Sequence, residues 1–284
     1  MKRILSALLF LVAIAQFVSA QDLTLPRVSQ NATVKQTVGL TDITITYCRP
    51  GVKGRAIWGE LVPYDQVWRT GANEATQITF SDDVKINGQN LPAGTYSLHT
   101  IPGKDQWTII FNSVAKQWGS FKYDKTKDAL RVQAKPQTGP NVEWMTFSFP
   151  EVGASSATIE LAWEKLRVPF QVETNTISKA VANIQKVVPT ATDWEVPYDA
   201  AEFAVNQNLD KKQAMDWVNR SIALKQTFWN LRLKADMLAK DGNTKEAIAL
   251  AEKAVALGKA NNDEADAVSA TEKQLASWKA SASK

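Results

Sequence analysis

The spacing of apolar residues changes near residue 177, and this change divides the chain into two segments of different kinds. Before it, apolar and polar residues alternate in short runs, which is the pattern of antiparallel strands. Eleven of the 13 glycines fall in this first segment, where they interrupt the runs as turn residues do. Proline is absent after Pro197, and apolar residues there recur at the three- and four-residue spacing of helices. The sequence therefore predicts a β-rich unit followed by an all-helical unit.

The first segment contains about ten short runs of strand character with little helix between them. Residues 43–47 put Ile43, Ile45 and Tyr47 on one face, and Asn87-Gly88 marks a hairpin turn. Other runs lie at residues 94–98, 107–111, 129–134, 144–149, 158–163 and 166–172. This succession favours an antiparallel β-sandwich or jelly roll over an α/β fold.

The second segment predicts a small array of helices. Shifting it by 33 residues superimposes Ala214 on Ala247 and Ser221 on Ala254, which resembles the period and small-residue positions of tetratricopeptide repeats. We expect Gly242 to end one helix in a left-handed conformation and Asn243 to cap the next. Helix pairs of this kind stack to bury a shared face, so the sequence predicts a helical-repeat-like unit that contacts a protein partner.

The N-terminus has the three parts of a secretory signal peptide. Lys2 and Arg3 precede an apolar run at residues 4–15, and Val18-Ser19-Ala20 forms a small-residue cleavage site. We therefore expect cleavage after Ala20 and export to the periplasm or outside the cell. No later run is long enough to span a membrane, and no cysteine lies near the cleavage point to carry a lipid anchor. The predicted division is a signal peptide at residues 1–20, a β-sandwich domain at 21–177 and a helical domain at 178–284.

Charge and cysteine usage limit the kinds of partner and cofactor. After removal of Lys2 and Arg3 with the signal, 31 basic and 29 acidic residues remain. Such a near-neutral chain argues against nucleic acid or an anionic membrane as its main partner. Cys48 and His99 are the sole cysteine and histidine, which excludes an intramolecular disulfide and a Cys/His zinc site. No Gly-rich phosphate loop is present, so we expect neither a metal nor a cofactor.

Residues 49–76 concentrate glycines, tryptophans and cationic residues that local propensity alone would not assemble. The cations of this stretch could converge on a carboxylate, phosphate or sulfate, because guanidinium groups bind planar anions in pairs. Alternatively, they clamp irregular loops to backbone carbonyls or pair with nearby acidic residues. These cations are Arg49, Lys53, Arg55 and Arg69, and the acidic residues are Glu60, Asp65 and Glu74.

Aromatic and acidic residues of the same stretch leave two further alternatives open. Trp58, Tyr64 and Trp68 form either an aromatic platform for a sugar ring or part of the core. Glu74 with Asp65 or Glu60 forms either an acid/base pair, as glycoside hydrolysis requires, or an ion network. In each case the structural role is the commoner one.

The run from Arg49-Pro50-Gly51 through Trp68-Arg69-Thr70-Gly71-Ala72-Asn73-Glu74 resembles the signature of the bacterial domain of unknown function 2911. Residues 91–98, 101–103 and 118–124 resemble it too, as do Asp128 and Arg131. The resemblance covers residues 24–172 and implies an exported protein of the Bacteroidetes type, often with a helical tail, but no activity. At Cys48 the family usually has serine, and at His99 an aromatic residue. The family motif points to a ligand-binding loop made of Arg49, Arg55, Trp58, Trp68, Arg69, Asn73 and Glu74.

These observations favour an exported, non-catalytic binding or scaffold protein, because no complete catalytic set is present. Its loop site would bind a small molecule or glycan, and its helical tail a protein. The first alternative is a hydrolase, for example of glycans, with Glu74 as acid or base, Asp65 as partner, Arg69 orienting an anionic group and Trp68 stacking the substrate. The second alternative is a purely structural component of the cell envelope.

Overall fold

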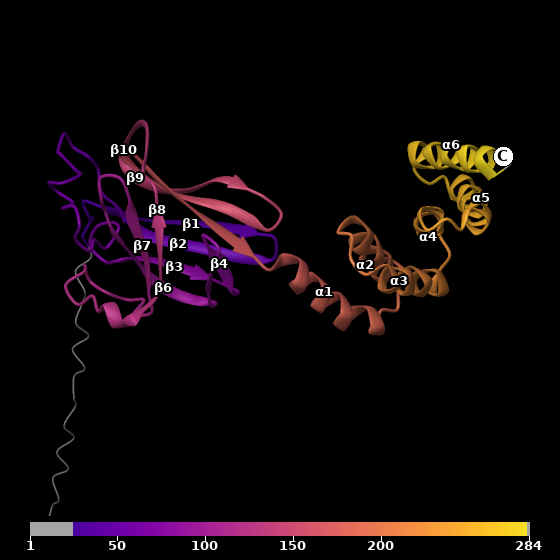
Figure 1. Cartoon of the computed structure of the whole chain (residues 1–284), viewed down its shortest axis with the longest axis horizontal. Coiled ribbons are helices and arrows are strands. Elements are labelled where there is room, and N and C mark those ends of the chain that lie inside the picture. Colours follow the sequence, from indigo (N-terminus) through magenta and orange to yellow (C-terminus); the bar gives the residue numbers. More distant parts are fainter. Residues whose placement is uncertain (1–24, 283–284) are drawn as a thin grey trace, which may run out of the picture.

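The structure of this chain, a computed structural model, describes residues 25–282. The predicted signal peptide at residues 1–20 and its cleavage site lie outside the described residues. Within 25–282 the chain forms ten strands followed by six α-helices, which confirms the predicted order of a β-rich and a helical part (Figure 1). The strands are β1 (Gln30–Val38), β2 (Thr41–Arg49), β3 (Thr76–Phe80), β4 (Val84–Ile86), β5 (Gln89–Leu91), β6 (Gly94–Ile101), β7 (Trp107–Asn112), β8 (Asp128–Ala134), β9 (Gln137–Val152) and β10 (Ser156–Thr174).

The strands form two antiparallel sheets. One has the order β1-β2-β3-β6-β7-β8 and the other β5-β4-β10-β9. Side chains from both sheets meet in one hydrophobic core, which includes Ile43 and Phe111 from the first sheet and Phe147 and Trp163 from the second. Two sheets that share a core in this way form a sandwich, as the sequence predicted.

Local patterns account for several of these strands. In β2 the side chains of Ile43, Ile45 and Tyr47 are buried on one face, as expected from their alternation. Asn87 and Gly88 have φ of +46° and +79° and form the two-residue turn between β4 and β5.

The prediction of separate strands at residues 158–163 and 166–172 is wrong. β10 is one strand, in which Glu164 at φ +51° shifts the register with β9 without ending the pairing.

The helices follow β10 after Asn175. They are α1 (Thr176–Val187), α2 (Glu195–Asn206), α3 (Lys211–Leu224), α4 (Phe228–Lys240), α5 (Thr244–Asn261) and α6 (Ala265–Ala282). Gly242 has φ +84° and ends α4, as expected. Asn243 occupies the cap position of α5, but its side chain makes no capping hydrogen bond, contrary to the prediction; its amide donates to Glu246 Oε2 at 2.8 Å.

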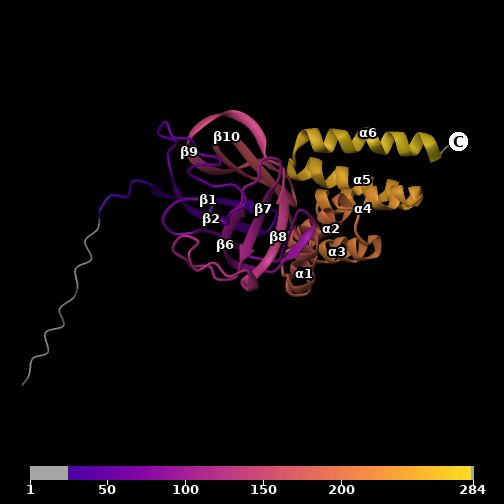
Figure 2. The same ribbon diagram turned by 60° about the vertical axis from the view of Figure 1, so that its left-hand side comes forward.

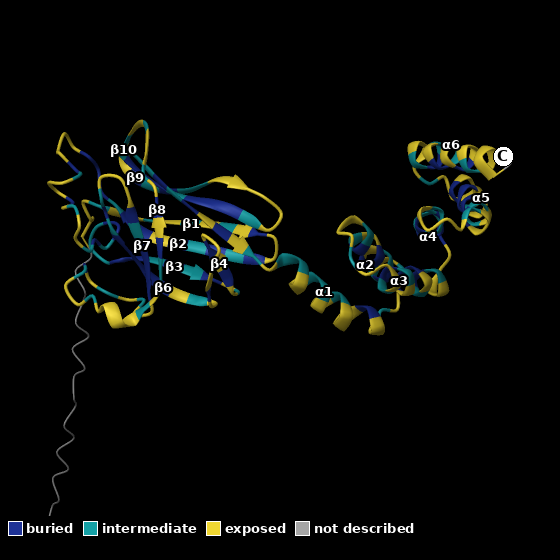
Figure 3. Cartoon of the chain, viewed as in Figure 1, coloured by how far each residue is buried: buried dark blue, intermediate teal, exposed yellow. Residues whose placement is uncertain are grey.

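The helices pack mainly on one another in chain order and extend away from one end of the sandwich (Figures 1 and 2). The link between the two parts is α1, which contains no buried residue (Figure 3). At its start, Lys179 Nζ donates to the carbonyl of Leu40 and to Asp82, both at 2.7 Å. Among residues 25–282, none of the helices combines the length and apolar content needed to cross a membrane.

Candidate functional site

Apart from Arg49, which ends β2, the predicted site residues lie in the long loop between β2 and β3, at the end of the sandwich away from the helices (Figure 1). Backbone hydrogen bonds fix this loop to both sheets. Val52 N–H donates to the carbonyl of Glu143 in β9 at 2.8 Å, and Trp68 N–H to that of Thr100 in β6 at 2.8 Å. Ala75 N–H donates to the carbonyl of Gln117 at 2.9 Å. The loop is therefore a fixed part of the fold.

Its backbone adopts conformations that side chains disfavour. Lys53, Asp65, Thr70 and Asn73 all have positive φ. Thr70, at φ +53°, is the most notable because a β-branched residue is strained in the left-handed region. Thr70 Oγ1 donates to Thr100 Oγ1 at 3.1 Å, and the carbonyl of Thr70 accepts from Thr76 Oγ1 at 2.6 Å. Such strain persists where the surroundings fix it, commonly beside binding sites.

Two of the predicted arginines act as clamps on the loop. Arg49 Nε donates to the carbonyl of Met145 at 2.9 Å, and its Nη2 to Thr146 Oγ1 at 2.6 Å. Arg55 donates to the carbonyls of Gly51 and Val52. The structure thus places both guanidinium groups on neutral oxygens, and it supports the loop-clamp alternative for them.

The tryptophans of the loop belong to an aromatic cluster with Trp107 and Trp163. Trp58 lies with its ring centroid 5.1 Å from that of Trp107, and Trp68 stacks on Trp163 at 6.0 Å. Trp68 is buried and Trp58 half-buried. This arrangement supports the core alternative for both rings and provides no open platform, although Trp68 and Trp163 also form one wall of a cavity.

Glu74 and Asn73 contact a segment that the sequence did not mark. Arg27 Nη1 lies 2.5 Å from Glu74 Oε2, and the carbonyl of Ser29 accepts from Asn73 Nδ2 at 3.2 Å. The hydrogen bond from Arg27 is the main reason that the pKa of Glu74 is lowered. Asp65 makes no hydrogen bond or ion pair with Glu74 among the described residues, so the two catalytic candidates are not brought together as a pair.

A second polar cluster lies beside β7 and β8, and its residues Tyr123, Asp128 and Arg131 belong to the family resemblance but were not predicted as a site. Asp128 accepts from Tyr123 Oη at 2.6 Å, from Arg131 Nε at 2.7 Å and from Asn112 Nδ2 at 2.8 Å. Burial is the main cause that raises the pKa of Tyr123 to about 12, and burial lowers the pKa of neighbouring His99 to about 4. The hydrogen bonds among Asn112, Tyr123, Asp128 and Arg131 satisfy these side chains, which indicates a structural network.

Arg69 differs from the other arginines of the loop. Its guanidinium makes no hydrogen bond or ion pair with any residue in 25–282, and its Nε is fully buried. Burial lowers the pKa of Arg69, and no carboxylate of the described chain opposes that effect. Removing a charge from water without providing a partner costs free energy. A bound anion could supply the ionic interaction that the guanidinium of Arg69 lacks.

Arg69 lines a cavity of about 210 Å³. Lys53 and Arg55 add two further cations to its wall, and the lining residues of the described chain include no carboxylate. Apolar surface comes from Val28, Leu61, Val62, Trp68 and Trp163. A positive, partly apolar cavity of this kind can hold a small organic anion.

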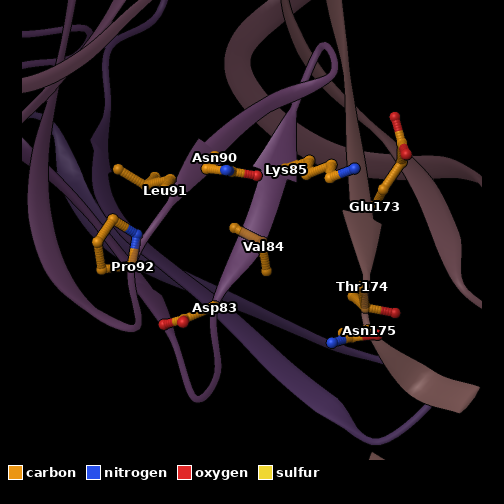
Figure 4. Close-up of a pocket in the computed structure, with 9 residues that line it drawn as sticks. All are labelled: Asp83, Val84, Lys85, Asn90, Leu91, Pro92, Glu173, Thr174 and Asn175. Atoms are coloured by element: carbon orange, nitrogen blue, oxygen red, sulfur yellow. The ribbon is translucent and has the colours of Figure 1, made fainter. Parts of the chain in front are cut away.

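A larger cavity of about 490 Å³ lies at β4, β5 and β10 (Figure 4). Three of its residues, Asn90, Lys85 and Glu173, form a row of cross-strand neighbours on the sheet. The carboxylates of Asp83 and Glu173 stand at opposite ends of the hollow, and Asp83 accepts from the N–H of Ala93 at 2.8 Å. The surface therefore has the polar pairing of an ordinary solvated sheet face. No group of His, Cys, Asp and Glu side chains suited to a metal ion occurs within residues 25–282.

Comparison with known proteins identifies one similarity. The model of a family described as a protein of unknown function, DUF2911, matches residues 29–172, just over half of the chain. The match contains the loop between β2 and β3 and all ten strands as far as Val172 in β10. No curated protein and no solved structure matches the chain.

Proposed function

The chain belongs to the DUF2911 family of proteins of unknown function, and from this premise we propose that it is a non-catalytic binding protein whose sandwich holds an anionic ligand beside Arg69. The observation that carries the proposal is the half-buried guanidinium of Arg69, which has no partner among the described residues. A bound anion stabilises a half-buried arginine more than a solvent-exposed arginine, because folding has already removed water from the half-buried guanidinium.

The cavity suggests the chemistry of the ligand. Lys53 and Arg55 contribute positive charge, and neither side chain forms an ion pair with a carboxylate in the described chain. Leu61, Trp68 and Trp163 offer apolar surface next to these charges. A carboxylate that carries a small apolar group fits both features. At about 210 Å³ the cavity is smaller than most sites for drug-sized ligands, so it suits a small molecule or the end of a longer one.

Two observations support binding over hydrolysis. Neither Glu74 nor Asp65 is among the residues that line the cavity. A general acid in glycoside hydrolysis needs a raised pKa, whereas the pKa of Glu74 is lowered by Arg27. The proposed role of Glu74 is therefore to tie the segment before β1 to the loop.

The proposal is tested by thermal unfolding of Arg69→Met and Arg49→Met variants with and without acetate, benzoate and inorganic phosphate. A ligand raises the midpoint of the parent protein because it binds the folded state. We expect Arg69→Met to lose this rise but to unfold at the parent midpoint or above it, because the change removes an unpaired charge. Arg49→Met should unfold several degrees lower, because each of its hydrogen bonds is worth about 1.5–3 kcal/mol and each kcal/mol moves the midpoint by roughly 2–4 °C.

A fall of several degrees for Arg69→Met would assign this arginine to the stability of the fold and contradict the proposal. The same conclusion would follow if none of the three anions raised the midpoint of the parent protein more than that of the variant. That second outcome would favour a purely structural role.

Export and protein binding complete the proposed role. The basic and apolar N-terminus supports cleavage after Ala20 and a location in the periplasm or outside the cell.

We also propose that residues 21–177 and 178–284 are separate domains and that the second is repeat-like. Its support is the spacing of the helices: α2 and α4 start 33 residues apart, and so do α3 and α5. Stacked helix pairs offer an extended surface for a protein partner.

A further inference from the structure

The loop between β7 and β8, residues 113–127, exposes large apolar side chains. Phe121 is 85% exposed, Trp118 is 62% exposed and Val114 is 43% exposed. Among the exposed large hydrophobic residues of the described chain, Phe121 has the highest value. Single exposed apolar residues are common, but two strongly exposed aromatic rings on one short loop are a feature that often marks an interaction site.

The loop holds these rings in place. Gly119 N–H donates to the carbonyl of Asn73 at 3.0 Å, and Ser120 Oγ donates to that of Val67 at 3.1 Å. Gly119 has φ +65°, and the ring of Phe121 lies so close that a Cβ at position 119 would come within 2.7 Å of it. The network of Tyr123 and Asp128 fixes the base of the loop. The exposure of the aromatic rings is therefore built into the fold.

The same loop is strongly basic. It carries four lysines and one acidic residue, Asp124, for a net charge of +3, although the whole chain is close to neutral. The lysines are exposed, and none forms an ion pair with a residue in 25–282; they are Lys116, Lys122, Lys125 and Lys127. The loop lies at the end of the sandwich opposite the helices, so the helical part does not cover it (Figure 1).

We propose that this loop binds the surface of an anionic lipid membrane, with Phe121 and Trp118 entering the interface and the lysines contacting lipid phosphates. Aromatic rings are favoured at the boundary between headgroups and acyl chains, and basic residues beside them add attraction to anionic lipid. A polyanionic polymer would bind the lysines, but its binding would give no reason for the exposed ring of Phe121. A second copy of the chain would bring like charges together. The inference does not depend on the cavity beside Arg69.

The test is sedimentation of the chain starting at Gln21 with lipid vesicles, since this form retains every described element and lacks the apolar N-terminal run. We expect binding to vesicles of equal phosphatidylcholine and phosphatidylglycerol, weaker binding at high salt, and little binding to phosphatidylcholine alone. Phe121→Ser should weaken binding roughly tenfold or more, because a full aromatic side chain leaves the interface. Lys122→Gln and Lys125→Gln should each weaken it roughly fivefold.

Matched controls are Val152→Ser, an exposed apolar residue in β9, and Lys85→Gln, an exposed lysine in β4; both should bind as the parent does. The proposal is overturned if the parent does not bind the anionic vesicles, or if Phe121→Ser binds them as well as Val152→Ser. A concentration-dependent dimer that disappears in Phe121→Ser would also overturn it, in favour of self-association.

Discussion

At the scale of single residues, the burial of His99 has a consequence for acid stability. Its ring is fully buried in β6, next to Tyr123 at a centroid distance of 5.1 Å. Burial lowers its pKa from 6.5 to about 4. The unfolded chain therefore binds the proton more readily than the folded one, so the stability due to neutral His99 is present above pH 6.5 and is lost as the pH falls toward 4.

We expect the free energy of unfolding attributable to His99 to decrease by roughly 2–3 kcal/mol between pH 7 and pH 4.5. His99→Phe keeps an aromatic ring in the same space but cannot bind a proton. Urea unfolding of the parent and this variant at both pH values measures the difference. An equal loss of stability in the two proteins would show that other groups, such as carboxylates held by ion pairs, cause the acid sensitivity.

The sequence predicted which stretch is unusual but not how its residues divide between roles. Arg49, Arg55 and Arg69 are alike in the sequence, yet the first two bind carbonyl or hydroxyl oxygens and the third has no partner in the described chain. That difference depends on β9 and on the loop's own carbonyls, which only the folded chain brings near. The contact of Arg27 with Glu74 was equally hidden, because it joins residues that are 47 positions apart.

At the scale of elements, the sequence missed β1, β3 and β5, and two of these, β1 and β5, have little apolar character. β1 is an edge strand in which Ala32, Val34 and Val38 alternate with polar residues that face solvent. β5 has three residues, of which Leu91 alone is buried. The helices from α3 onward were easier to predict, because each of them buries one face that recurs at helical spacing. Apolar periodicity reveals an element when that element must bury one face. An edge strand buries less of its surface, so its sequence shows a weaker pattern.

Close packing of helices gives a prediction at Gly258. A Cβ at this position in α5 would lie 2.7 Å from Val268 in α6 and 3.1 Å from Phe228 in α4. Helix propensity favours alanine over glycine by about 1 kcal/mol. We nevertheless expect Gly258→Ala to lower the stability of the helical part by about 1–3 kcal/mol, because the added methyl group separates three packed helices.

Chemical unfolding followed by circular dichroism measures this change. Gly242→Ala is the matched control, since its Cβ would meet no atom within 4 Å and its cost comes from the backbone at φ +84° alone. A rise in stability for Gly258→Ala would mean that α5 can move to accept the methyl group and that propensity outweighs packing there.

At the scale of the whole molecule, the connection between sandwich and helices is slight. The sheets share one hydrophobic core, whereas the helices bury their apolar residues in separate clusters. α1 has no buried residue, and its contacts through Lys179 are with exposed groups of the sandwich. We therefore expect two calorimetric unfolding transitions, one for each part. A single transition with equal calorimetric and van't Hoff enthalpies would show that the two parts unfold together.

The net charge of the chain illustrates what a sum over the sequence conceals. A total near zero predicted that an anionic membrane is not the main partner, yet the charges are not evenly placed. Residues 113–127 carry +3 and hold their aromatic rings in solvent. Composition describes the average surface, whereas binding depends on the local one. The order of the two parts, by contrast, was predictable because it rests on periodicity along the whole chain.

The attachment of the loop between β2 and β3 also determines when the cavity can form. Val52 bonds to Glu143, Trp68 to Thr100 and Ala75 to Gln117, so the loop is complete only after strands distant in sequence have assembled. Such long-range contacts are slow to form because each closes a long stretch of flexible chain. We therefore expect the cavity beside Arg69 to form late in folding, after the transition state. An anion bound there would slow unfolding and leave the rate of refolding almost unchanged.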